Sequence, residues 1–97
     1  MKHTFENETI KLFLEGELNS SNADDIEKEI DSILGKYNFN NIVFDLEKLH
    51  YISSAGLRII IRLKKLHNNV SLIKVTSEVY GIFEMVGFTN ILDIEKL

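Results

Sequence analysis

The sequence has 97 residues, of which 44% are hydrophobic and 27% are charged, and it contains no Cys, Pro or Trp. This length accommodates one domain spanning residues 1–97, and the composition excludes extended disorder. The absence of Cys excludes disulfides, thiolate metal sites and thiol catalysis, while a net charge of −4 disfavours a nucleic-acid partner.

The N-terminal segment predicts an antiparallel hairpin. Residues 3–6 and 9–14 have the composition of two short strands joined at Asn7-Glu8. In the second strand, apolar and mostly polar positions alternate, as expected when one face of a sheet is buried; the apolar positions are Ile10, Leu12 and Leu14.

A helix is expected next, over residues 23–34. Apolar residues recur there at helical spacing: Ala23, Ile26, Ile30, Ile33 and Leu34. Ser21 or Asn22 would cap its start, and Ser21 with Asp24 resembles a capping box. Gly35 is expected to end the helix in the left-handed conformation.

The remainder alternates between strands and helices. Residues 41–46 and 70–75 form continuous apolar runs typical of parallel strands buried on both faces, and the first should be central. Helices are expected over 55–67 and from Ser77 to Gly87, and residues 91–97 form either an edge strand or a helical turn. The sequence predicts an α/β domain with a mixed, mostly parallel sheet of four to five strands and three or more helices.

The strongest functional signal lies where the central strand leads into the second helix. Ser53 and Ser54 fall at the cap or first turn of that helix, where free backbone N–H groups and the helix dipole stabilise an anion. Gly56 would permit close packing. Capping accounts for only one of the two serines.

The second helix also predicts a protein-binding face. Its buried arc is expected to contain Gly56, Ile59, Ile60, Leu63, Leu66 and His67. Leu57 and Ile61 lie off that arc, in the direction of three cationic side chains: Arg58, Lys64 and Lys65. An apolar pair with a charged rim is typical of a docking surface, although single exposed apolar residues are also ordinary.

Four motifs together resemble the STAS domain family, which is named for sulphate transporters and anti-sigma factor antagonists. They are Gly16-Glu17-Leu18-Asn19, Ile42-Val43-Phe44-Asp45-Leu46, Tyr51-Ile52-Ser53-Ser54-Ala55-Gly56-Leu57-Arg58 and Gly87-Phe88. The resemblance covers nearly the whole chain and implies the STAS fold, with the element order ββαβαβα followed by a strand or helix. The length is similar to that of a stand-alone bacterial antagonist.

The resemblance implies a regulatory protein and not an enzyme. Such an antagonist binds an anti-sigma factor that is also a serine kinase, phosphorylation in the turn ends binding, and a PP2C-type phosphatase resets the switch. Similar proteins phosphorylate the hydroxyl residue directly before the glycine, and that position is Ala55 here. Ser54 is therefore our first choice of acceptor, and Ser53 is the second.

The resemblance places the partner-binding residues around this turn and on the loop after the second strand. They are Asn19, Ser53, Ser54, Ala55, Gly56, Leu57, Arg58 and Ile61. Asn19 stands where many members of the family have Asp, so this loop is less acidic than in those members.

A second hypothesis is a phosphorylation-independent STAS subunit of a transporter or stress-signalling complex, in which Ala55 marks loss of the switch. A small α/β enzyme is less favoured, because the sequence contains no phosphate-binding loop or nucleophile elbow. The three histidines lack metal-ligand spacing, so we expect neither metal nor cofactor. No apolar run approaches the ~20 residues of a membrane span, and the N-terminus is unlike a signal peptide. We therefore expect no membrane insertion and a cytoplasmic location.

Overall fold

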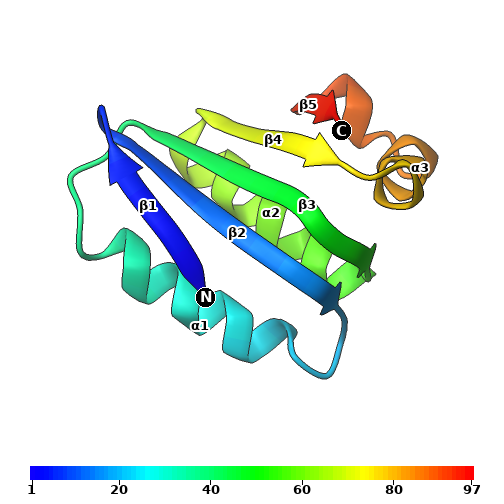
Figure 1. Ribbon diagram of the computed structural model, residues 1–97, viewed down its shortest axis with the longest axis horizontal. Helices are drawn as coiled ribbons and strands as arrows, with labels where there is room; N and C mark the ends of the chain where they lie inside the picture. The colour runs from blue at the N-terminus through cyan, green and yellow to red at the C-terminus, as the bar shows by residue number, and fades with distance from the viewer.

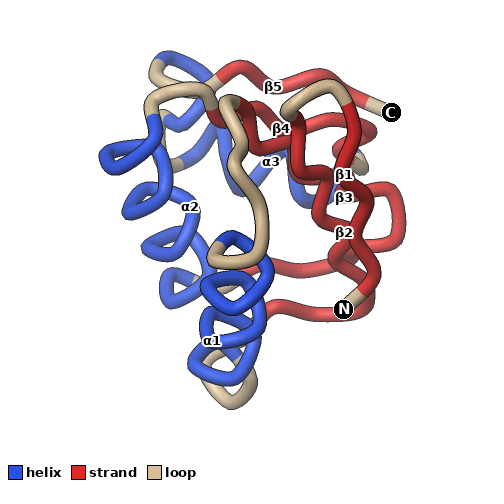
Figure 2. Tube along the Cα trace, turned by 90° about the vertical axis from the view of Figure 1, so that its left-hand side faces the viewer, coloured by secondary structure: helices blue, strands red, loops and turns tan.

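The computed structural model describes all 97 residues, which form a five-stranded sheet with α1 and α2 on one of its faces (Figure 1; Figure 2). In chain order, the elements are β1 (Lys2–Glu6), β2 (Thr9–Leu18), α1 (Ala23–Leu34), β3 (Asn41–Ile52), α2 (Ser54–His67), β4 (Val70–Val75), α3 (Ser77–Met85), a short 3-10 helix (Phe88–Asn90) and β5 (Asp93–Lys96). No helix combines the length and apolar character that crossing a membrane would require.

The strands lie in the order β1-β2-β3-β4-β5. β1 pairs with β2 in the antiparallel direction, whereas the other three pairings are parallel. This confirms the predicted hairpin, the mixed sheet and the central place of the third strand. Of the two alternatives for residues 91–97, the structure contains the edge strand, because β5 pairs with β4.

The core lies between the sheet and the two helices on that face. Ile10, Leu12 and Leu14 of β2 are buried, as their alternation predicts. On β3, however, Val43 is only half-buried, although the apolar run predicted burial on both faces. That expectation was wrong because α1 and α2 pack on the same face and leave part of the opposite face to solvent.

Two predictions about the ends of α1 are also wrong. Gly35 has φ −70°, so the helix ends without a left-handed residue. At the start, Asn22 is the N-cap residue but makes no capping bond, and Ser21 forms no capping box. The Asn22 carboxamide oxygen instead accepts a hydrogen bond from the Asn19 N–H at 2.9 Å, which orders the loop that precedes the helix.

One arginine of α2 forms ion pairs with two carboxylates of α1. The Arg62 guanidinium of α2 donates to Glu27 and Asp31 of α1, with both N–O distances 2.7 Å. The pKa of Arg62 is raised above its ordinary value, mainly by the hydrogen bond to Asp31. These two contacts join α2 to α1.

Candidate functional site

The turn with the two serines lies at the carboxyl ends of two neighbouring parallel strands (Figure 1). Leu18 at the end of β2 pairs with Ile52 at the end of β3. The Ser53 N–H donates to the Leu18 carbonyl at 2.8 Å, so the loop that begins at Asn19 runs beside the serine turn. Open α/β sheets place their binding sites at such strand ends.

The two serines have different environments. Ser53 is the half-buried N-cap residue of α2, in extended conformation, and its hydroxyl accepts a hydrogen bond from the Gly56 N–H at 3.4 Å. Ser54 is the first residue of α2 and is exposed, and its hydroxyl is not used in capping. Capping therefore uses the Ser53 hydroxyl, whereas Ser54 remains accessible.

Gly56 is required by close packing. A Cβ atom at this position would lie 2.7 Å from Leu18 Cγ and 2.8 Å from Ile52 Cγ1. These distances are shorter than carbon atoms tolerate, so the first turn of α2 approaches the strand ends only because residue 56 has no side chain. The residue thus positions the serines and is itself buried.

The two residues of the predicted docking pair on α2 differ in burial. Leu57 is 8% exposed and belongs to the core, so the prediction that it faces a partner was wrong. Ile61 is half-buried, whereas Leu66, which we placed in the buried arc, is 64% exposed. The sequence pattern gives the spacing of an apolar stripe, but packing on the sheet and on α1 decides how the helix is rotated about its axis.

A groove of about 450 Å³ lies between α1 and α2 beside the exposed serine. Three of the predicted partner-binding residues, Ala55, Arg58 and Ile61, line it. The opposite wall contains Asp24 and Glu27 of α1. We name Ser54 together with these five residues the Ser54 surface.

The acidic wall was missed by sequence reasoning, which treated the charges of α1 as a solvated face. Its position depends on contacts between residues more than 30 apart in the sequence, such as that between Arg62 and Glu27. The only available signal was that an acidic helix and a helix without acidic residues have complementary charges.

Asn19 lies beside the serine turn, and its side chain forms hydrogen bonds within its own loop. Its carboxamide oxygen accepts hydrogen bonds from the N–H groups of Ser21 at 2.9 Å and Asn22 at 3.1 Å. The side chain therefore holds the loop between β2 and α1 in place. No group of three or more His, Cys, Asp or Glu side chains is arranged to hold a metal ion.

Known proteins resemble this chain in sequence. The sequence profile of the STAS domain matches residues 2–96. A protein of Bordetella bronchiseptica that is named as an anti-sigma factor antagonist, BtrV, is 34% identical over 85 residues, covering 84% of this chain and 72% of the relative.

Solved structures share the fold at lower identity. A protein of Thermotoga maritima described as an anti-sigma factor antagonist has a TM-score of 0.87 and 22% identity, covering 99% of this chain and 86% of its own. The anti-sigma factor antagonist SpoIIAA of Bacillus, in its unphosphorylated form, has a TM-score of 0.76 and 19% identity, covering 96% and 85%. Its phosphorylated form has a TM-score of 0.65 and 18% identity, covering 96% and 88%. From the profile match over residues 2–96 and the BtrV relative, we conclude that this chain belongs to the STAS domain family.

Proposed function

We propose that this protein is a non-enzymatic antagonist of an anti-sigma factor, that it binds its partner through the Ser54 surface, and that phosphorylation of Ser54 ends binding. The partner is expected to be a serine kinase as well as an anti-sigma factor, and a PP2C-type phosphatase would remove the phosphate. A regulator of sigma factors acts in the cytoplasm, which is where we expect this protein.

The relatives support this role. BtrV and SpoIIAA are both named as anti-sigma factor antagonists. SpoIIAA has been solved in unphosphorylated and phosphorylated forms, so a domain of this fold accommodates a phosphate without losing its architecture.

The observation that carries the choice of acceptor is the different use of the two hydroxyl groups. Ser53 is half-buried and its hydroxyl caps α2, whereas Ser54 is exposed and its hydroxyl is not used in capping. A kinase needs an accessible hydroxyl, which favours Ser54. Ala55, at the position that usually accepts phosphate, has no hydroxyl, and its side chain packs against the core.

A phosphate on Ser54 would change binding more than folding. It adds ~1.5–2 negative charges at the N-terminus of α2, where the helix dipole favours an anion. The same charge would lie beside the groove, which is lined by Asp24 and Glu27 and also by three cations, Arg58, Arg62 and Lys65. A partner that fits the neutral hydroxyl would have to desolvate the phosphate, and a hundredfold loss of affinity requires only ~2.7 kcal/mol.

Three variants test the switch by calorimetric titration with the kinase-type anti-sigma factor of the same organism. Ser54→Asp should weaken binding ~10-fold or more, whereas Ser54→Ala should bind like the wild type and resist modification. Ser53→Asp is the matched control, because Asp is also a good N-cap residue. It adds the same charge one residue earlier without disturbing the helix, and it should bind more tightly than Ser54→Asp.

Phosphate mapping distinguishes this proposal from the second candidate. After incubation with the kinase and ATP, mass spectrometry should locate phosphate on Ser54, and a PP2C-type phosphatase should remove it. If neither serine is modified and Ser54→Asp binds the partner like the wild type, the switch is refuted. A phosphorylation-independent subunit of a transporter or stress-signalling complex, favoured by Ala55, then replaces it.

A further inference from the structure

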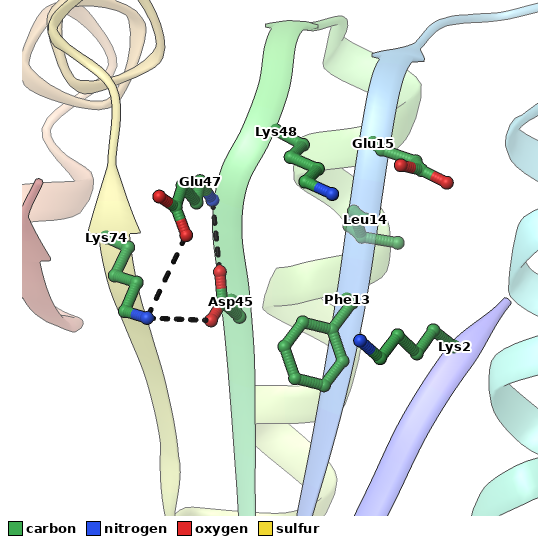
Figure 3. A pocket seen from close by; sticks show the side chains of 8 residues that line it. All are labelled: Lys2, Phe13, Leu14, Glu15, Asp45, Glu47, Lys48 and Lys74. Atoms are coloured by element: carbon green, nitrogen blue, oxygen red, sulfur yellow. Dashed lines mark hydrogen bonds and ion pairs between the residues drawn. The ribbon is translucent and has the colours of Figure 1, made fainter.

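A second cavity lies on the face of the sheet opposite α1 and α2. It has a volume of about 220 Å³ and is lined by side chains from β1, β2, β3 and β4 (Figure 3). None of these residues belongs to the Ser54 surface. The cavity therefore does not overlap the proposed partner interface.

The strand register places three chemically different side chains in one row across the floor of this cavity. Lys2 pairs with Phe13, and Phe13 pairs with Asp45. The Lys2 ammonium lies 5.1 Å from the centre of the Phe13 ring, and Asp45 is only 4% exposed. A cation, an aromatic ring and a carboxylate thus follow one another across three strands, over a distance of about 10 Å.

Irregular backbone brings a fourth residue into the cavity. Lys74 has φ +53°, which is uncommon for a residue other than glycine, and the pairing of β4 with β5 shifts register at this point. Regular alternation from the buried Leu72 would direct Lys74 towards the helices. Its ammonium instead lies 3.8 Å from Asp45 Oδ2 and 3.8 Å from Glu47 Oε1. Bulges and strained residues of this kind are common where a side chain is aimed at a site.

β3 contains a second irregularity in the same place. Its register against β2 shifts between the pairs Phe13–Asp45 and Glu15–Lys48, so β3 has one residue more than β2 here. Lys48 consequently projects over β2, while the Glu15 carboxylate points away from Phe13 (Figure 3).

The two ends of the cavity have opposite formal charge. At one end, Asp45 and Glu47 outnumber the single ammonium of Lys74, whose distances of 3.8 Å to both carboxylates are too long for direct hydrogen bonds. Asp45 Oδ1 accepts a hydrogen bond from the Glu47 N–H at 3.1 Å, so Asp45 Oδ2 and the Glu47 carboxylate are the acceptors left for a ligand. At the other end, Lys2 and Lys48 outnumber the Glu15 carboxylate, and none of these three side chains belongs to an ion pair of the structure. The aromatic ring of Phe13 lies between Lys2 and Asp45 (Figure 3).

We propose that this cavity binds a small, elongated zwitterion with an apolar or aromatic centre. Its carboxylate would lie at Lys2 and Lys48, its centre on the Phe13 ring, and its amino group at Asp45 and Glu47. The volume suits a single substituted ring, since a cavity of about 150 Å³ holds benzene. An α-amino acid is too short to reach both ends, because its amino and carboxylate groups are bonded to the same carbon atom.

Three probes of the same shape test this proposal by calorimetry and by NMR titration of the ¹⁵N-labelled full chain. They are 4-(aminomethyl)benzoate, which has both charges, 4-methylbenzoate, which has only the carboxylate, and 4-methylbenzylammonium, which has only the ammonium. The zwitterion should bind at least ~10-fold more tightly than either singly charged probe. Its amide shifts should be centred on Phe13 and Asp45.

Variants assign the two ends. Lys2→Gln should weaken binding of the zwitterion and of 4-methylbenzoate about fivefold or more, with no effect on the cation. Glu47→Gln should weaken the zwitterion and the cation instead. Lys11→Gln is the matched control, because Lys11 belongs to the same strand as Phe13 but does not line the cavity.

Three outcomes would overturn the proposal. The first is that 4-methylbenzoate binds as tightly as the zwitterion, and the second is that Lys11→Gln weakens binding as much as Lys2→Gln. The third is the absence of any shift at zwitterion concentrations of about 1 mM. Far-UV circular dichroism would establish that each variant is folded, and none of these results bears on phosphorylation at Ser54.

Discussion

Replacing Gly56 by Ala tests whether the start of α2 is held by close packing against the strand ends. The added Cβ would lie 2.7 and 2.8 Å from Cγ and Cδ2 of Leu18 and 2.8 Å from Cγ1 of Ile52. Leu18 and Ile52 are 1% and 2% exposed, so neither has free space into which to move. To relieve these contacts, either the first turn of α2 or the ends of β2 and β3 must shift.

The magnitude follows from two opposing contributions to the free energy of unfolding. Overpacking a core by one methyl group costs ~1–3 kcal/mol, occasionally more. Alanine regains up to ~1 kcal/mol through its higher helix propensity. Because two buried side chains must adjust together, we expect a net loss of ~1–2 kcal/mol, which lowers the melting temperature of a domain of this size by roughly 5–15 °C.

Urea unfolding followed by far-UV circular dichroism measures this loss, with Gly81→Ala as the control. Gly81 also lies in a helix, but a Cβ there meets no atom within 4 Å, so this substitution should be neutral or stabilising by up to ~1 kcal/mol. In a Leu18→Ala background, the cost of Gly56→Ala should fall, because the clashing side chain is shorter. The packing argument is refuted if Gly56→Ala unfolds at the wild-type midpoint, or if Gly81→Ala is equally destabilised.

Two further predictions concern stability around the same helix. Ser53→Ala should lower the free energy of unfolding by ~0.5–1 kcal/mol because it removes the N-cap, whereas Ser54→Ala should change it by less than ~0.5 kcal/mol; equal losses in thermal unfolding would contradict the assignment of the cap. Arg62→Met should cost ~0.5–1.5 kcal/mol through its two partly exposed ion pairs to α1, and the difference from the wild type should shrink in high salt. Arg58→Met, which removes an exposed and unpaired cation, is its control and should be nearly neutral.

Much of the fold was predictable because its signals are local. The helix over 23–34 begins and ends as its apolar spacing predicts, since that spacing reports which face a helix buries. The strand over 70–75 is also as predicted, and the hairpin turn at Asn7-Glu8 joins β1 to β2. The serine turn was likewise located from its position between a buried strand and a helix.

Other predictions were less successful, mostly where contacts between distant segments decide the outcome. The end of α1 at Gly35 needs no left-handed residue because the chain continues with right-handed backbone. Leu57 is buried and Leu66 is exposed, which is the reverse of the prediction, because the sheet and α1 together set the rotation of α2 about its axis. The cavity that we propose to bind a zwitterion could not be predicted from the sequence, since Lys2, Phe13 and Asp45 become neighbours only through strand pairing.

The sequence by itself determined an α/β fold, the order of its elements, its resemblance to the STAS family and a turn with two serines and a glycine. These depend on periodicity and on residue types that are adjacent in the chain. The tertiary structure alone decided which serine hydroxyl is occupied, why residue 56 must be glycine, and which side of α2 remains exposed. The physical reason is that burial and hydrogen bonding at each of these positions depend on strands and helices that are distant in the sequence and meet only in the folded protein.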